Sequence, residues 1–161
     1  MPQQAQQGPQ LYIKETFQDW QMQCLKVPQQ SGAEEEVCQM FQLLKDAEGN
    51  NVAEVTIAKL EGGKPGPAGG TFIVPLQTLL TKKLAVSVDG AQPRLYDFSF
   101  CTTIGCFARV AFSAEDIARF KAGAKATVSL TPMVAPDQVV TVNMSLSGFT
   151  AAYDAASTVR P

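Results

Sequence analysis

The sequence predicts an all-β protein, mainly an antiparallel β-sandwich or partly closed barrel of about seven to nine short strands with one or two short helices. Several segments alternate apolar and polar residues with the period of two that a half-buried strand requires. Clusters of Asp, Asn, Gly and Pro, which favour turns, separate these segments. Strands and helices do not alternate regularly along the chain, which argues against a parallel sheet.

The alternation places the expected strands. It is clearest in residues 138–149, where the apolar face is Val140, Val142, Met144 and Leu146 and the polar face is Thr141, Asn143, Ser145 and Ser147. The expected strands span residues 16–25, 37–45, 52–60, 71–76, 79–88, 96–100, 107–112, 125–133 and 138–149. Turn chemistry at 46–51 predicts a hairpin between the second and third of these.

Two short helices are expected. Ser113 and Asp116 match a capping box, and Ile117, Phe120 and a stop at Gly123 then define one amphipathic helix. A second helix is expected over 151–157. With 161 residues the chain can bury a sizeable core, so we expect one domain over 15–155. Residues 1–14 are expected to be a disordered arm and 156–161 a loose end.

Composition excludes several classes of function. The net charge is −2, and no basic run is longer than Lys82-Lys83, so nothing indicates binding to nucleic acid or anionic lipid. No apolar run reaches the ~20 residues of a membrane helix. Histidine is absent, which excludes Ser-His-Asp and Cys-His nucleophile systems and His-ligated metals. We expect a protein that is not an enzyme and needs no cofactor or metal.

The first ten residues are rich in Gln and Pro and lack the apolar core of a signal peptide. A cytosolic protein is one interpretation. The other, which the cysteines favour, is an exported protein whose native leader has been replaced by the initiator Met.

Four cysteines, Cys24, Cys38, Cys101 and Cys106, allow three disulfide pairings. Pairing sequence neighbours is geometrically easy, because a cross-strand pair in a hairpin has its Cα atoms about 4.5 Å apart. Gly105 can supply the positive φ of a short turn before Cys106. A zinc site of four cysteines and a redox-active dithiol are alternatives, but the spacings fit both poorly. Structural disulfides would imply an oxidising compartment.

Three other features invite functional interpretations. Trp20, on an alternating face, is expected to anchor the core rather than to bind a ligand. Glu34, Glu35 and Glu36 are expected to form a solvated loop edge. The glycine-rich stretch 61–70 lacks the Gly-Lys-Ser/Thr and helix start of a phosphate loop, so we expect a mobile connection.

The order and spacing of several motifs resemble the invasion-associated locus B family, small exported proteins of Gram-negative bacteria. The motifs are Phe17-x-Asp-Trp20-x-x-x-Cys24, Cys38-x-Met40-x-Gln42, Val86-x-Val88-Asp89-Gly90, Cys101-x-x-x-Gly105-Cys106-x-Ala108 and Ser145-Leu-x-Gly148-Phe149. The likeness covers about residues 15–155. The glycine/proline insertion at 62–70 and the aromatic approach to Cys101 depart from the family's pattern. The resemblance implies a periplasmic or surface-associated β-rich protein with two local disulfides and no catalytic residues to carry over; some members promote entry into host cells.

Three hypotheses of function follow. The first is a non-enzymatic exported protein that binds a cell-envelope or host-cell partner of unknown identity. The second is a chaperone-like envelope stress or assembly factor that captures partners at a sheet edge. The third is a carboxylate-based glycan hydrolase, which needs two acidic groups facing each other across a groove. Its candidates are Asp89, Asp97, Glu115 and Asp116, which lie near turns or a helix start.

Overall fold

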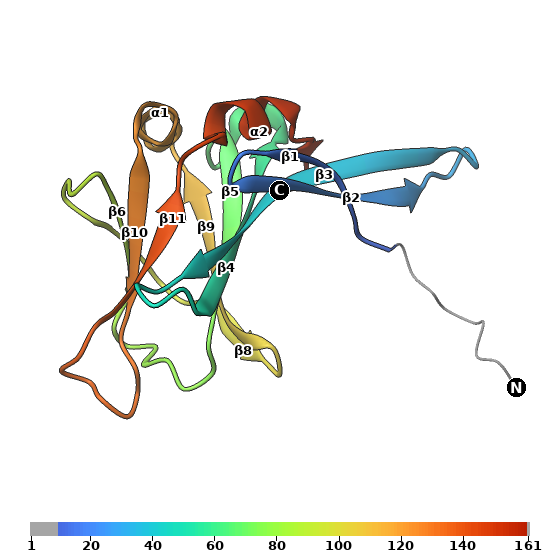
Figure 1. The fold of residues 1–161 in the computed structure, drawn as a ribbon. Coiled ribbons are helices and arrows are strands. Elements are labelled where there is room, and N and C mark those ends of the chain that lie inside the picture. Colours follow the sequence, from blue (N-terminus) through green and yellow to red (C-terminus); the bar gives the residue numbers. More distant parts are fainter. Residues whose placement is uncertain (1–9, 161) are drawn as a thin grey trace, which may run out of the picture.

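One twelve-stranded sheet, curled into a half-barrel, forms most of the computed structural model, which describes residues 10–160 (Figure 1). The strands are β1 (Tyr12–Phe17), β2 (Trp20–Pro28), β3 (Glu34–Lys45), β4 (Asn51–Leu60), β5 (Ala68–Val74), β6 (Leu84–Val88), β7 (Arg94–Tyr96), β8 (Phe100–Thr102), β9 (Gly105–Phe112), β10 (Lys125–Leu130), β11 (Val140–Ser145) and β12 (Thr158–Val159). The helices are α1 (Ala114–Ala122), α2 (Phe149–Ala155) and the 3₁₀ turn η1 (Glu61–Gly63).

The strand order explains the curl. Neighbours run β7-β6-β10-β11-β3-β4-β5-β9-β8, all antiparallel, while β1 and β2 extend from β3 and β12 joins β4 in parallel. A single curled sheet is the partly closed barrel of the prediction; the alternative of two stacked sheets is wrong for this chain. The predicted hairpin of 37–45 with 52–60 is present as β3 and β4.

Apolar side chains of alternate strand positions fill the concave face, as the period of two predicts. The two helices lie side by side at one end and close this core (Figure 1). The rings of Phe120 in α1 and Phe149 in α2 lie 5.4 Å apart between centroids, and Trp20 meets Phe149 edge to face at 5.6 Å. Trp20 is fully buried, which agrees with its expected role as a core anchor.

Helix α1 begins as predicted. The Ser113 hydroxyl accepts from the Asp116 amide, and the Asp116 carboxylate accepts from the Ser113 amide. This reciprocal pair satisfies two amide donors that a helix start leaves free. Helix α2 begins at Phe149, two residues earlier than expected.

Several predicted boundaries are wrong. Residues 1–9 lie outside the described residues, but β1 starts at Tyr12, so the expected disordered arm does not extend to residue 14. Residues 158–159 pair with β4, so the described part of 156–161 is not a loose end. The expected strand 16–25 is broken by a turn at Gln18 and Asp19, where Gln18 has a φ of 55°. The three glutamates at 34–36 form the start of β3 rather than a loop.

Candidate functional site

The two disulfides link neighbouring strands and leave no free cysteine in the described residues. Cys24–Cys38 joins directly opposed residues of β2 and β3, and Cys101–Cys106 does the same in the hairpin of β8 and β9. These are the neighbour pairs that the sequence favoured. Because all four sulfur atoms are in disulfides, a four-cysteine zinc site does not fit the structure.

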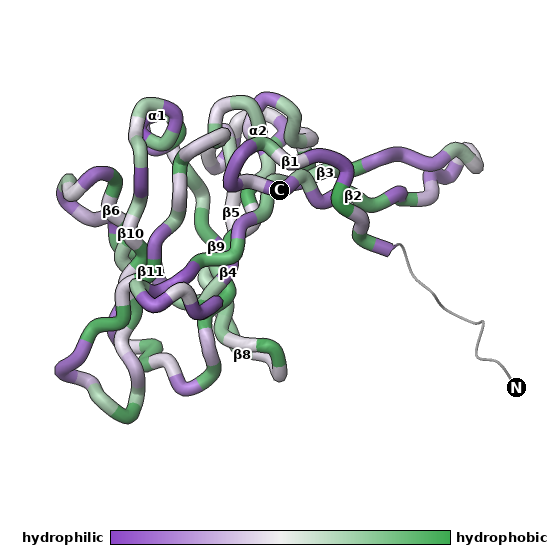
Figure 2. Tube along the Cα trace, viewed as in Figure 1, coloured by the Kyte–Doolittle hydropathy of each residue, from purple (hydrophilic) through white to green (hydrophobic). Residues whose placement is uncertain are grey.

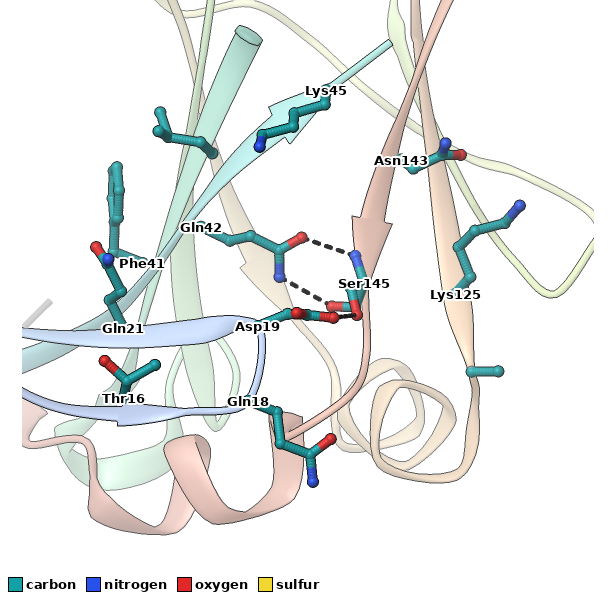
Figure 3. Close-up of a pocket in the computed structure, with 12 residues that line it drawn as sticks. Thr16, Gln18, Asp19, Gln21, Phe41, Gln42, Lys45, Lys125, Asn143 and Ser145 are labelled. Atoms are coloured by element: carbon teal, nitrogen blue, oxygen red, sulfur yellow. Dashed lines mark hydrogen bonds between the residues drawn. The ribbon is translucent and has the colours of Figure 1, made fainter. Parts of the chain in front are cut away.

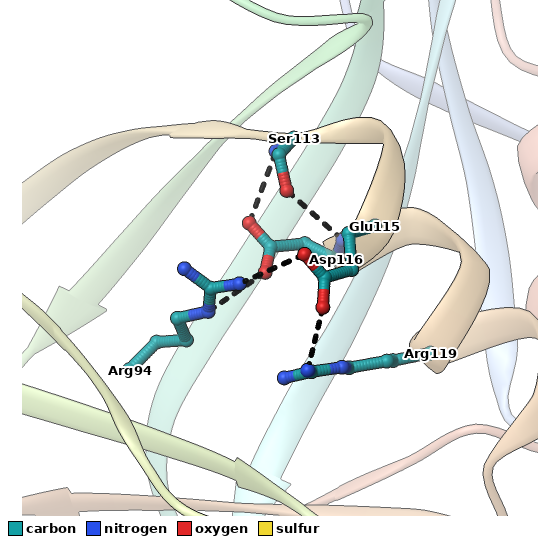
Figure 4. A network of polar contacts seen from close by, with 5 residues as sticks. All are labelled: Arg94, Ser113, Glu115, Asp116 and Arg119. Atoms are coloured by element: carbon teal, nitrogen blue, oxygen red, sulfur yellow. Dashed lines mark hydrogen bonds and ion pairs between the residues drawn. The ribbon is translucent and has the colours of Figure 1, made fainter.

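Each of the four candidate carboxylates has a hydrogen-bond or ion-pair partner within the protein. Asp89 accepts from the amides of Ala124 and Lys125, and Asp97 pairs with Lys83 at 3.5 Å on the surface. Figure 4 shows the other two: Asp116 caps α1 and contacts Arg94 at 3.1 Å, while Glu115 contacts Arg119 at 2.7 Å and Arg94 at 3.7 Å.

The main grooves do not bring two of these carboxylates together. Each of five grooves on residues 10–160 has at most one acidic residue in its lining. A glycosidase-type mechanism needs two carboxyl groups facing each other about 5 to 9.5 Å apart. These five grooves therefore offer no acidic pair for the hydrolase hypothesis.

The glycine-rich stretch 61–70 is also structural. It forms η1 and then enters β5 at Ala68, and no long helix follows it that could hold a phosphate. A Cβ added at Gly66 would lie 2.3 Å from the carbonyl oxygen of Phe112, so the chain passes too close to β9 for any larger residue.

The most distinctive site lies where the sheet divides. β3 pairs with β2 as far as Phe41 and then with β11 at Lys45, so its edge has no strand beside it in between. Gln42 fills this gap with its side chain. Its amide nitrogen donates to the Ser145 carbonyl at 3.0 Å, and its amide oxygen accepts from the Ser145 N–H at 2.7 Å. Because Gln42 is only 7% exposed, this pair closes the floor of the split.

Two further bonds fix Ser145 in place. The Trp20 indole N–H donates to the same carbonyl at 2.9 Å, and the Ser145 hydroxyl donates to Asp19 at 2.5 Å. The described side chains leave no buried polar atom without a partner. The floor of the split is therefore a rigid, fully bonded polar network.

Above this floor lies an open groove of about 550 Å³, hereafter the split-sheet groove (Figure 3). The turn between β1 and β2 forms one wall, and β10 and β11 form the other. Its lining residues are Thr16, Gln18, Asp19, Gln21, Phe41, Gln42, Leu43, Lys45, Ala124, Lys125, Asn143 and Ser145. Polar amides, one aromatic ring and two lysines can bind a polar ligand.

The sequence carried one overlooked signal for this site. Gln42 falls on the same alternating face as Cys38, Met40 and Leu44, so a polar residue interrupts a stripe that packs into the core. A buried amide needs hydrogen-bond partners, so a glutamine in this stripe indicates polar groups within its reach. The approach of Gln42 to Ser145, by contrast, depends on residues 103 positions apart.

A second surface is the end of the half-barrel opposite the helices, formed by connections 75–83, 103–104 and 131–139 and hereafter the loop end. Two of these connections are tied together, because Leu79 N–H donates to Thr131 and Met133 N–H donates to Gln77, each at 2.7 Å. Six large apolar side chains are exposed there: Leu76, Leu80, Ile104, Met133, Val134 and Val139. Figure 2 shows hydrophobic segments at these tips.

These features define a disulfide-linked, curled β-sheet protein with a polar surface groove. The family model described as "Invasion associated locus B (IalB) protein" matches residues 20–157, and the chain belongs to this family. Two invasion protein B homologs of Brucella abortus, from strains 2308 and 9-941, are each 32% identical over 143 residues, covering 88% of this chain and 78% of the relative. The resemblance drawn from the motifs is thereby confirmed.

A solved structure has the same fold. The crystal structure of invasion associated protein B from Bartonella henselae matches with a TM-score of 0.65 and 21% identity, covering 88% of this chain and 93% of that chain. No helix among residues 10–160 is long and apolar enough to cross a membrane.

Proposed function

We propose that this chain is a non-enzymatic exported protein, periplasmic or surface-associated, that acts by binding a cell-envelope or host-cell partner at the split-sheet groove. Two disulfides support export, because such bonds persist in oxidising compartments. Relatives named as invasion proteins support a role at the bacterial surface or in contact with a host.

The observation that carries the proposal is the contrast between the floor and the walls of the groove. The floor is satisfied internally by Gln42 and Ser145. The walls present Lys45, Lys125 and Asn143, whose side chains have no hydrogen bond or ion pair within residues 10–160. A rigid floor beneath unengaged polar walls is the arrangement of a preorganised binding site.

Compartment is tested first. The gene, with its native leader, is expressed in its Gram-negative host, and fractions are treated with a thiol-alkylating reagent of defined mass. The proposal predicts a periplasmic or surface fraction in which no cysteine is alkylated before reduction. A cytoplasmic fraction with four alkylated cysteines would overturn it.

Binding is tested by site-specific photo-crosslinking in intact cells. A photo-reactive residue replaces Gln21 in the groove or, as a matched control, Ala111 on β9, which lies outside it. One discrete crosslinked species from position 21 alone is expected. Equal labelling from both positions would contradict the groove, and many unfolded clients would favour the chaperone-like alternative.

A role in invasion is tested in the same strain. A deletion mutant is complemented with the wild-type gene or with a Lys45→Gln/Lys125→Gln variant, and entry into host cells is counted. The proposal expects lower entry for the deletion and for the groove variant. Normal entry by the deletion strain would contradict a role in invasion, and only the binding of a cell-envelope partner would remain of the proposed function.

A further inference from the structure

We infer that the split-sheet groove binds an acidic saccharide chain, one that carries sulfate, phosphate or carboxylate groups. The inference rests on the proposed function and names the chemistry of the ligand at that site. Four features of the groove carry it: its unpaired lysines, its free amides, its aromatic wall and its open shape.

The lysines come first. Lys45 and Lys125 have no ion pair within residues 10–160, whereas Lys14, Lys83 and Lys121 each have one. The only carboxylate in the lining, Asp19, is engaged by the Ser145 hydroxyl. The two lysines lie on the two strands that flank β11. Lys45 on β3 is opposite Asn143, and Lys125 on β10 is opposite Ser145.

Strand spacing sets the distance between these charges. Lys45 and Lys125 lie two strands apart and about two residues out of step, so their Cα atoms are about 12 Å apart. Two ammonium groups on long stems at this separation suit a ligand with charges repeated along a chain better than one small anion. Attraction of this kind acts locally, within about 8 Å at physiological salt, so the net charge of −2 does not oppose it.

The amides supply the neutral contacts. The side chains of Gln18, Gln21 and Asn143 are each in the lining and have no hydrogen-bond partner within residues 10–160. Each amide offers two donors beside one acceptor, which matches neighbouring hydroxyl groups of a sugar ring. Gln18 is held in the turn with a φ of 55°, one of three positive values at non-glycine residues in the described chain. Such backbone conformations concentrate at functional sites.

The aromatic wall and the open shape favour a saccharide over other polyanions. Phe41 borders the groove and provides a face for the C–H groups of a sugar ring. Beyond the groove, the face of β10 and β11 that carries Lys125 and Asn143 also carries the hydroxyls of Ser129 and Thr141, which lie 3.2 Å apart. A chain molecule can therefore extend along this face. Two lysines are too few for the phosphate contacts on which nucleic-acid affinity depends.

Strand addition by a peptide is blocked at this edge. The backbone N–H and C=O of Ser145 are the groups that an incoming strand would need, and the Gln42 amide already holds both. Binding at the groove therefore uses side chains rather than a main-chain ladder. This feature separates the inference from the chaperone-like alternative.

The test uses the full chain with both disulfides intact. Binding is measured by calorimetry and by NMR chemical-shift changes with three probes: a heparin-derived hexasaccharide, a phosphorylated core oligosaccharide released from lipopolysaccharide, and neutral maltohexaose. Lys45→Gln/Lys125→Gln removes the groove charges. Lys64→Gln/Lys82→Gln removes two exposed charges outside the groove as a matched control. Thermal melting checks that both variants fold.

We expect at least one acidic probe to bind about tenfold more tightly than maltohexaose, because each ion pair at an exposed site contributes a modest factor. The groove variant should lose about tenfold and the control less than twofold. Shift changes should centre on Gln21, Asn143 and neighbouring amides. Preference for the sulfated probe identifies a host-type ligand, and preference for the phosphorylated probe identifies one from the bacterial envelope.

Three outcomes would overturn the inference: no binding of either acidic probe at millimolar concentration, equal binding of maltohexaose, or equal losses in the two double variants. These outcomes are separate from failure of the proposed function. A crosslinked protein partner at position 21 without saccharide binding would reject the ligand class alone, whereas a cytoplasmic location with four alkylated cysteines would reject the function alone.

Discussion

The side-chain amide of Gln42 takes the place of a missing strand beside Ser145, donating to its carbonyl and accepting from its N–H at 3.0 and 2.7 Å. This relationship joins the two halves of the curled sheet where β2 and β11 part from β3.

The bond between Gln42 and Ser145 predicts that Gln42→Leu destabilises the fold by about 1–3 kcal/mol, because the partly buried Ser145 N–H loses its partner. Urea unfolding measures the loss. Gln39→Leu, three residues before Gln42 and on the opposite face of β3, should stay within about 0.5 kcal/mol. Equal stability of both variants would contradict the role.

The disulfides are expected to contribute unequally. Loop closure gives about 3 kcal/mol for Cys24–Cys38, whose cysteines are 14 residues apart, and about 2 kcal/mol for Cys101–Cys106, which are 5 apart. Urea unfolding of the two double Cys→Ser variants measures these losses.

The two disulfides should also differ in their accessibility to a reductant. Cys24 and Cys38 are buried, whereas Cys101 is exposed. Mild reductant followed by alkylation and mass mapping should therefore label 101 and 106 first. Labelling of 24 and 38 first would show that the β2–β3 ribbon opens more readily than the β8–β9 hairpin.

Substitutions at two glycines distinguish the cost of a strained backbone conformation from the cost of a steric clash. Gly148 and Gly90 have φ of 85° and 77°, but a Cβ at Gly148 would lie 2.0 Å from the Phe17 carbonyl oxygen, whereas one at Gly90 meets nothing within 4 Å. Gly90→Ala should cost about 1 kcal/mol from conformation alone. Gly148→Ala should cost about 3 kcal/mol or more, because the β1–β2 turn must also move. Denaturant midpoints compare the two, and similar losses would mean that the turn yields freely.

Acid should loosen the attachment of β1. Lys14 contacts Glu36 at 2.5 Å, and this bond, together with one from the Tyr12 hydroxyl, holds the pKa of the Glu36 carboxyl below its usual range. A carboxyl whose pKa is lowered by folding stabilises the protein above its unfolded pKa, and the contribution is lost as pH falls through the folded value. The urea midpoint should therefore drop less between pH 7 and pH 3 in Glu36→Gln than in wild type. Glu34→Gln, on the same strand, should behave as wild type does.

The loop end should be the dominant apolar surface of the described chain. Val134 and Ile104 are 79% and 74% exposed on two of the connections at this end, and exposed apolar groups of this kind favour contact between molecules. Val134→Ser and Ile104→Ser together should shorten retention on a hydrophobic-interaction column without changing the urea midpoint by more than about 0.5 kcal/mol. Unchanged retention would indicate that these side chains are not the dominant apolar surface.

Much of the fold was predictable because its signals are local. Alternation in β3, β4 and β11 identified strands, and Ser113 with Asp116 identified the start of α1, since each depends on residues within a few positions. The predictions were wrong where contacts between segments distant in the sequence determine the structure. The sequence of residues 158–159 does not indicate a strand, because these residues become a strand only by pairing with β4. The position of Asp116 at a helix start makes it a catalytic candidate in the sequence, but in the fold its carboxylate caps α1 and contacts Arg94.

By itself, the sequence determined the all-β class, the cysteine pairs and the family, since period, turn chemistry and motif spacing are properties of the chain as a string. Only the tertiary structure decided where β3 loses its neighbour, and therefore that Gln42 meets Ser145 beneath Lys45 and Lys125. The physical reason is that sheet curvature and strand pairing bring together residues about a hundred positions apart, and no local preference specifies that meeting.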